Sequence, residues 1–255
     1  MADVDQTIGG TVLFEHPLNE FTRTALRIEY LLSLAAQALA DPSHLAPYGF
    51  WRALFDLMEL LDRGDVRQDL IKELDRTINE LPALVSRGCC PGTAEQELRE
   101  QLQQHVQTLR SCARLGQPLR DDRFFMTLRQ RFALAAGQCS FDLPQFHLWL
   151  HRPEEVRRSQ MRHYLGLMEP VQRAFGDWLH LVRCRGKFSS EVASGGFYQN
   201  SAEQLQLLRI RLSPAVGAFP SISGNRLRFT VRFVAPQADR ECFLDHDVAF
   251  DLARC

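Results

Sequence analysis

The spacing of apolar residues changes once along the chain, near Cys184, and this change constrains the fold more than any other feature. Before it, apolar residues recur at alternating steps of three and four, as in the segment 18–39, which places them on one side of a helix. After it, the segments 204–212 and 226–234 alternate in steps of two, and the segment 242–252 is predicted to be a third strand. Such alternation is typical of antiparallel strands with one buried face. The sequence therefore predicts an α+β protein with helices first and a sheet last.

A short run of strand-forming residues, ended by a proline, precedes the helices. The late strands would be marginally stable alone, so we expect the early strand to join them. The predicted organisation is a helical bundle domain over 18–184, inserted between an N-terminal strand and a C-terminal antiparallel β-sheet domain. That β domain comprises 11–17 and 185–255, and residues 1–10 are expected to be flexible.

Capping residues predict several helix starts. Asn19 can cap the first long helix, and Asp121–Asp122 can cap a helix that runs to about Leu134. Pro144, Pro153 and Pro170 each suit the first turn of a further helix. A second helix is expected from about Phe50 to Leu61, and residues 115–118 are expected to break the chain.

The narrow apolar stripe of the first long helix admits two interpretations. It can pack inside the helical bundle, or it can form the seam of a dimer. The stripe is short, which favours the core.

Charge is unevenly distributed along the 255 residues, although the net charge is only −1. Residues 1–104 hold 9 Lys and Arg against 17 Asp and Glu, whereas residues 105–185 hold 13 against 7. The basic middle suggests an anionic partner, which can be nucleic acid, a membrane surface or an acidic peptide.

Several classes of protein are disfavoured by the sequence. Its apolar runs are too short to span a bilayer, and the acidic start does not resemble a secretory signal. Seven scattered cysteines are expected to be reduced thiols in a cytoplasmic protein. The chain has no Gly-rich phosphate loop, nucleophile elbow or HExxH motif, so no enzyme and no cofactor are predicted.

Two histidines, His147 and His151, lie four residues apart on a predicted helix, which is a metal-ligand spacing. The sequence offers no evident third ligand, and Trp149 between apolar neighbours indicates packing. We therefore expect no metal site.

Arginines are the more informative candidates. Arg23 and Arg27 fall opposite the apolar stripe, beside Glu20, and Arg120 and Arg123 flank a predicted helix cap. An arginine can direct two N–H donors at a carboxylate or phosphate. The alternative is a solvated surface, on which Glu20 pairs with Arg23 at little gain in stability.

A third group of arginines, Arg226, Arg228 and Arg232, alternates along a predicted strand, with Phe229 and Phe233 on the other phase. This pattern suits a nucleic-acid surface, and equally the polar face of an amphipathic strand. Because of the basic middle of the chain, a nucleic-acid-binding regulator that uses the region 105–185 is the alternative function.

Ordered sequence strings from about Val12 to the C-terminus resemble the ZapD family of bacterial cell division accessory proteins. The strings are Leu13–Glu20, Arg23–Thr24, Leu26–Glu29, Arg63–Arg67, Lys72–Arg76, Leu119–Arg123, Arg129–Arg131, Cys139–Pro144, Trp149–His151, Gly196–Gln199 and Ile222–Gly224. The chain departs from the family by an additional stretch, Met1–Gly10, and by expected length differences near 85–94 and 236–243.

The resemblance implies a non-enzymatic, cytoplasmic homodimer at the mid-cell division ring. Such a protein binds the C-terminal tail of FtsZ, the tubulin-like GTPase of that ring, and cross-links its protofilaments into bundles. The tail is acidic with a few apolar anchors, so arginines should hold it beside an apolar groove. The expected partners are FtsZ and a second copy of the chain, with neither nucleic acid nor a membrane.

The same resemblance implies the tail-binding residues Arg27, Arg123 and His147, with Arg23 and Arg120 nearby. Their convergence in space comes from the family alone.

Overall fold

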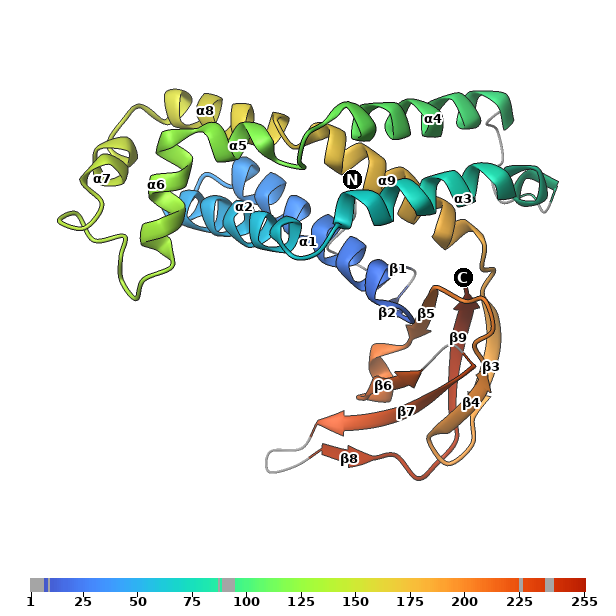
Figure 1. Ribbon diagram of the computed structural model, residues 1–255. Coiled ribbons are helices and arrows are strands. Elements are labelled where there is room, and N and C mark those ends of the chain that lie inside the picture. Colours follow the sequence, from blue (N-terminus) through green and yellow to red (C-terminus); the bar gives the residue numbers. More distant parts are fainter. Residues whose placement is uncertain (1–6, 9, 87, 89–94, 225–226, 237–240) are drawn as a thin grey trace. The chain divides into compact units, whose positions relative to one another are not determined.

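The computed structural model describes residues 7–8, 10–86, 88, 95–224, 227–236 and 241–255. Two strands come first, helices fill the middle and further strands end the chain (Figure 1). The helices are α1 (Glu20–Ala40), α2 (Ala46–Asp62), α3 (Val66–Ser86), α4 (Glu95–Ser111), α5 (Gln117–Asp121), α6 (Arg123–Phe132), α7 (Pro144–Leu150), α8 (Glu154–Gly166) and α9 (Glu169–Cys184). The strands are β1 (Thr7–Ile8), β2 (Thr11–Pro17), β3 (Ser189–Ala193), β4 (Phe197–Ser201), β5 (Leu207–Leu212), β6 (Phe219–Gly224), β7 (Arg228–Pro236), β8 (Glu241–Phe243) and β9 (Val248–Arg254).

The predicted α+β class is confirmed, and so is the insertion of the helices between strands. β2 pairs antiparallel with β5, with Phe14 opposite Ile210. By contacts, the described residues of 27–81 and 93–178 form a helical unit, and those of 3–26, 82–92 and 179–255 form a second unit with the strands. The domains predicted from the sequence have other boundaries, because they are placed where the spacing of apolar residues changes. Those boundaries, 18–184 for the helical domain and 11–17 with 185–255 for the β domain, stay a prediction.

Two predicted caps are present. Asn19 Oδ1 accepts a hydrogen bond from the Thr22 N–H at 2.7 Å, and Asp122 Oδ1 accepts one from the Phe125 N–H at 2.7 Å. Each satisfies a backbone donor that the first turn of a helix leaves unpaired. Pro144 opens α7, as predicted.

Two helix boundaries differ from the prediction. α2 begins at Ala46 rather than near Phe50, because Pro47 lies in its first turn, where a missing N–H costs nothing. Pro118 likewise lies in the first turn of α5. The sequence predicts a break in the chain at this point, and the structure has a short helix there.

The apolar stripe of α1 belongs to the core of the chain. Ala25, Ile28, Leu32 and Ala35 are all at most 2% exposed. The interpretation of this stripe as a dimer seam is therefore wrong, because residues of the same chain already cover it.

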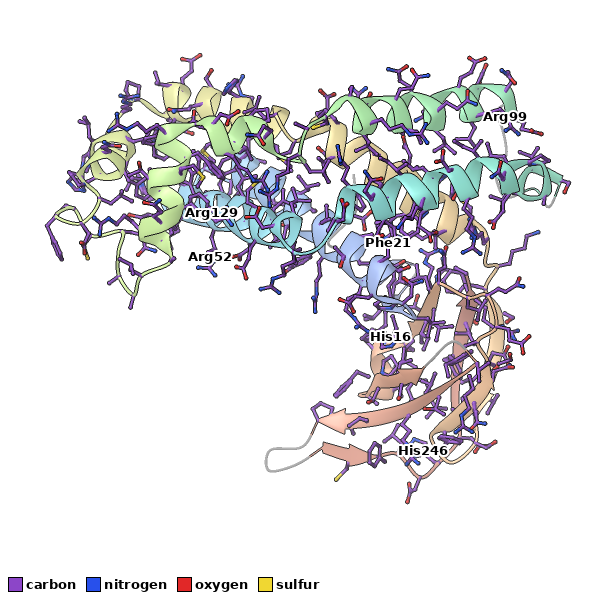
Figure 2. All side chains as sticks on the ribbon, viewed as in Figure 1. His16, Phe21, Arg52, Arg99, Arg129 and His246 are labelled. Atoms are coloured by element: carbon purple, nitrogen blue, oxygen red, sulfur yellow. The ribbon has the colours of Figure 1, made fainter. Side chains whose placement is uncertain are left out.

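Polar contacts join the α3–α4 pair. Arg99 of α4 donates one hydrogen bond to the Ile78 carbonyl of α3 at 3.3 Å and another to Glu95 at 2.8 Å (Figure 2). His105 Nε2 of α4 lies 2.6 Å from Asp177 Oδ2 of α9.

Among the described residues, no helix is both long and apolar enough to span a bilayer.

The strands form two sheets rather than the single small sheet predicted. One has the order β1-β2-β5-β9-β3, and the other has the order β4-β7-β6 with β8 also paired to β7. Between them lies one apolar core, which includes Ile210, Leu252, Val231 and Phe233.

Three strands, β3, β4 and β6, escaped prediction because Ser, Asn, Gly and Pro interrupt their apolar alternation. The predicted strand over 242–252 is two strands, β8 and β9, separated by exposed Asp245–Asp247. The predicted flexible segment 1–10 falls mostly outside the described residues, but Thr7–Ile8 within it form β1 and pair with β2.

An ion-pair cluster connects β2 to its neighbours in the second unit. The Glu15 carboxylate, only 9% exposed, accepts hydrogen bonds from Arg183 at 2.7 and 2.9 Å and from Arg209 at 2.8 Å. The bidentate geometry suits a carboxylate removed from solvent, where removing one partner would leave an uncompensated charge.

Candidate functional site

Aromatic packing around Trp51 positions two of the predicted site helices. Trp51 of α2 is fully buried and contacts Phe124 of α6, Trp149 of α7 and Tyr164 of α8. The ring centroids lie 5.8, 5.6 and 5.0 Å away, respectively, within the range of favourable edge-to-face contacts. The start of α6 and the body of α7 are therefore fixed to one rigid support.

Arg123 is the first residue of α6 and precedes Phe124 in this packing. Its side chain is exposed, and within the described residues its guanidinium forms no ion pair or hydrogen bond. A helix start carries positive potential, which here adds to the arginine charge and is partly offset by the Asp122 cap.

His147 lies on the exposed side of α7, opposite the buried Phe146 and Trp149. Its ring centroid is 4.6 Å from that of His151. The His151 Nδ1 lies 2.8 Å from the His147 carbonyl oxygen, which can only accept, so Nδ1 carries the proton. The segment thus presents two neighbouring imidazoles to solvent.

In the part of the chain that the structure describes, no group of three or more His, Cys, Asp or Glu side chains could hold a metal ion. His147 and His151 remain a pair of possible ligands without a third.

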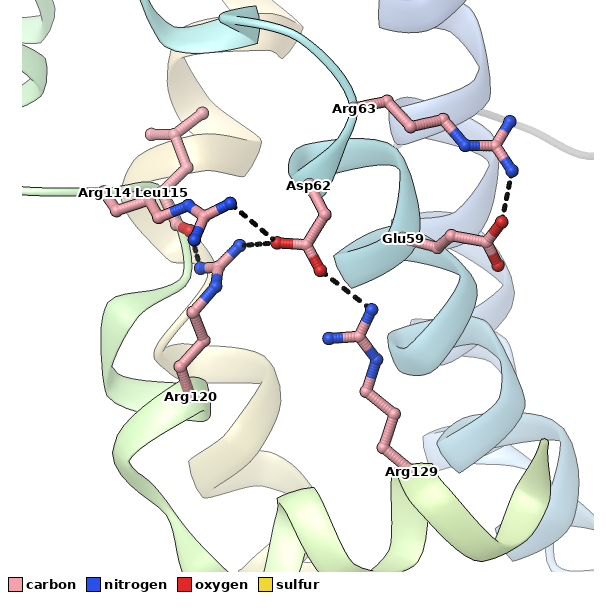
Figure 3. A network of polar contacts seen from close by, with 7 residues as sticks. All are labelled: Glu59, Asp62, Arg63, Arg114, Leu115, Arg120 and Arg129. Carbon is pink, nitrogen blue, oxygen red and sulfur yellow. Dashed lines mark hydrogen bonds and ion pairs between the residues drawn. The ribbon is translucent and has the colours of Figure 1, made fainter.

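Arg120 is engaged elsewhere, in what we call the Asp62 cluster: Asp62 with Arg114, Arg120 and Arg129 (Figure 3). The Asp62 carboxylate accepts hydrogen bonds from Arg120 at 2.5 Å and from Arg129 at 2.8 Å, and Arg114 lies 3.3 Å away. Arg120 also donates to the Leu115 carbonyl. With a side chain only 13% exposed, Arg120 connects α2 to α5 rather than facing solvent.

Electrostatics in this cluster favour the ionised carboxylate. Burial acts to raise the pKa of Asp62, but hydrogen bonds and charges from Arg120 and Arg129 outweigh it and lower the pKa. Three guanidinium groups around one carboxylate leave excess positive charge, and the most exposed of the three belongs to Arg114.

α1 carries the other two predicted residues, one helical turn apart. Arg23 is paired with Glu20 at 2.8 Å, as the solvated-surface alternative predicted. Burial, followed by the charge of Arg23, lowers the pKa of neighbouring His16, so this histidine is neutral at pH 7. Arg27 is exposed, and its guanidinium has no ion pair or hydrogen bond among the described residues.

The packing around Trp51 thus brings together the helices of Arg123 and His147. The convergence of Arg27 with them stays a prediction. Sequence reasoning missed Asp62 as the partner of Arg120, because the two residues are 58 positions apart. It also missed the exposed apolar residues Phe141 and Leu148 near His147. Helical spacing could have placed Leu148 on the side of His147 and His151, whereas no sequence signal marks Phe141 as exposed.

A family model described as "ZapD: Cell division protein" matches residues 26–232. The chain belongs to the ZapD family. Curated members include "Cell division protein ZapD" from Klebsiella pneumoniae subsp. pneumoniae, 40% identical over 247 residues that cover 96% of this chain and 98% of that protein. The ZapD of Serratia proteamaculans is 38% identical over 249 residues, covering 97% and 99%. That of Pectobacterium carotovorum subsp. carotovorum is 39% identical over 248 residues, covering 96% and 98%.

The ZapD match extends across both units of the chain and confirms the predicted family. These relatives are named cell division proteins and not enzymes, which points to a non-enzymatic role in division. The site described above is therefore considered as a surface for a division partner.

Proposed function

We propose that this protein binds the C-terminal tail of FtsZ and, as a cytoplasmic homodimer, cross-links FtsZ protofilaments at the mid-cell division ring. It performs this role without catalysing a reaction. Membership of the ZapD family supports the role in division. The binding and cross-linking come from what the family resemblance implies.

One structural observation carries the choice of site. Of the five predicted residues, Arg23 and Arg120 are committed to Glu20 and Asp62, whereas Arg27, Arg123 and His147 are exposed. An acidic tail that meets an arginine without an ion-pair partner gains a charge-assisted hydrogen bond and breaks none. We therefore assign direct contact to Arg27, Arg123 and His147, and a supporting part to Arg23 and Arg120.

Cross-linking requires two tail sites in one particle. A two-fold symmetric dimer supplies them with a single kind of interface. The α1 stripe is buried in the core, so the dimer must use another surface.

The test is fluorescence anisotropy with a labelled peptide of the FtsZ C-terminal tail. Replacing Arg27→Glu or Arg123→Glu should reduce affinity by at least tenfold, because each change converts an attraction into a repulsion. Arg173→Glu makes the same change of charge at an exposed position of α9 paired with Glu169, and should leave affinity unaltered. Wild-type affinity in both Arg27→Glu and Arg123→Glu would remove them from the site.

Besides the basic region 105–185, the strand arginines offer the nucleic-acid alternative a second candidate surface, which lies in the second unit. Arg232 of β7 lies with its guanidinium 5.1 Å from the ring centroids of Phe197 and Phe243, and Arg228 is exposed on the same strand. Arg226 lies outside the described residues. These rings already hold the arginine, so they are less available for stacking on bases. A gel shift with random-sequence DNA should show no binding at physiological salt.

A further inference from the structure

The surface around α7 combines exposed apolar side chains with cationic ones. Phe141, in the loop before α7, is 82% exposed, and Leu148 on the helix is 64% exposed. A single exposed apolar residue is ordinary, but here Leu148 lies on α7 next to the histidine pair and Phe141 lies three residues before that helix, so the two are candidates for one contact surface. We call Phe141, His147, Leu148 and His151 the α7 surface.

Helical spacing explains why the part of this surface that lies on α7 is coherent. Positions 144, 147, 148 and 151 are separated by three, four and seven residues, so they share one side of the helix. All four are exposed, whereas Phe146 and Trp149, on the other side, are at most 2% exposed. The sequence therefore displays Leu148 outward while two aromatic residues secure the helix inward.

The support beneath this surface is rigid. Phe146 packs against Phe132 at 5.3 Å and Trp149 at 5.6 Å between ring centroids, and the Trp149 Nε1–H donates to Gln160 Oε1 at 2.7 Å. A surface that is already held in place loses little conformational freedom of its own when a partner binds to it.

Successive turns hold Phe141 in position. The loop before α7 contains backbone hydrogen bonds from Gly137 to Leu134, from Cys139 to Ala136 and from Asp142 to Cys139, at 3.0–3.1 Å. Phe141 is thus exposed on a hydrogen-bonded loop.

Charge favours an acidic occupant. Between Phe141 and Arg152 the sequence has one acidic residue, Asp142, which lies 3.9 Å from Arg131. Arg152, which directly follows the histidine pair, is exposed and carries a permanent positive charge. Glu154, at the start of α8, is already paired with Arg158 at 2.7 Å. The exposed cations next to apolar side chains fit a peptide that is itself acidic and apolar.

We propose that Phe141 and Leu148 bind the apolar side chains of the same acidic peptide whose carboxylates Arg123 and His147 hold. This inference rests on the proposed function, because it takes the FtsZ tail as the occupant. Two kinds of contact then contribute to the affinity. Arg123 and His147 supply the salt-sensitive part, and Phe141 and Leu148 supply a salt-insensitive part.

The experiment measures affinity for the labelled tail peptide across a salt series, with Phe141→Ser and Leu148→Ser as variants. Each should weaken binding about three- to thirtyfold, as expected for losing a partly buried large apolar contact. The dependence of log affinity on log salt should keep its wild-type slope, because no charge has changed. Leu227→Ser, at an equally exposed leucine of the second unit, is the matched control and should bind like wild type.

A double-mutant cycle makes the contact specific. A peptide whose apolar residues are replaced by serine should bind wild-type protein weakly, and Phe141→Ser or Leu148→Ser should then cause little further loss. This non-additivity also guards against a variant that weakens binding by disturbing the fold, since such a variant would still lose affinity for the altered peptide.

The outcomes separate the two levels of proposal. If Arg123→Glu weakens binding but both serine variants match wild type, the inference about the α7 surface is overturned and the proposed function stands. If wild-type protein does not bind the tail peptide at any salt, the proposed function fails, and the inference fails with it.

Discussion

At the residue scale, the arginines of the helical unit divide into those that hold the fold and those that face solvent without a partner. Sequence spacing predicts local pairs such as Glu20 with Arg23, because residues three apart on a helix are neighbours. It cannot predict that Arg120 and Arg129 meet Asp62, since the loops and helices between them determine that distance. The sequence therefore identified the candidate arginines. Only the packing showed which of them stabilise the fold and which are free to bind a partner.

The Asp62 cluster gives a prediction about stability. Asp62→Asn should lower the free energy of unfolding by about 1–3 kcal/mol at pH 7, because Arg120 and Arg129 would lose charge-assisted hydrogen bonds. The pKa of Asp62 is lower in the folded chain than in the unfolded one, so its contribution is present above about pH 4. It is lost as the pH falls through the folded-state pKa, and urea unfolding should show wild type and variant converging there.

Glu59→Gln is the control, because Glu59 pairs with Arg63 in the same region of α2 but both side chains are more than half exposed (Figure 3). It should change the unfolding free energy by less than about 0.5 kcal/mol. Equal losses in the two variants would show that the Asp62 cluster is no more important than a surface pair.

At the element scale, helices were predictable and short strands were not. A cap such as Asn19 or Asp122 acts within four residues, so its consequence is written locally in the sequence. β4 depends on pairing with β7, which begins only at Arg228, whereas β6 pairs with β7 as the next strand in the chain. In both segments, apolar and polar residues alternate too little to predict a strand. Pro220 is tolerated because β6 is an edge strand.

The Asp122 cap links helix stability to the candidate site. Asp122→Ala should lower the stability of the first turn of α6 by about 1 kcal/mol, because the Phe125 N–H loses its acceptor. Fraying there would also loosen Arg123 and weaken tail binding. Asp122→Asn removes the same charge but keeps a capping oxygen, so the difference between the two variants reports the hydrogen bonds of this side chain rather than its charge.

Hydrogen exchange of the Phe125 amide measures this effect directly. Exchange should be faster in Asp122→Ala than in Asp122→Asn, and tail affinity should fall only in the former. If both variants bind the tail equally well, the order of the α6 start does not contribute to the site.

At the scale of the whole molecule, family membership indicates a division protein and leaves its assembly to experiment. We expect a homodimer, so light scattering should give a mass near 58 kDa, twice the 29.2 kDa of one chain. A mass of one chain at every concentration would contradict cross-linking by a two-site particle.

Salt should affect bundling more steeply than single-tail binding. Contacts between exposed arginines and carboxylates are screened over about 8 Å at physiological ionic strength. Once one site of a dimer holds a tail, the second meets neighbouring tails at high effective concentration, and avidity can exceed single-site affinity by about 10²–10⁴. Light scattering of FtsZ filaments should therefore collapse over a narrow salt range, whereas peptide affinity should decline gradually.

The most direct test of the central claim is sedimentation of FtsZ filaments with this protein, comparing full-length FtsZ with FtsZ that lacks its C-terminal tail. We predict that full-length filaments form bundles that pellet at low speed, and that tail-deleted filaments stay in the supernatant at every salt concentration. Equal pelleting of the two would contradict the account, because the protein would then be binding the globular body of the filament rather than its tail.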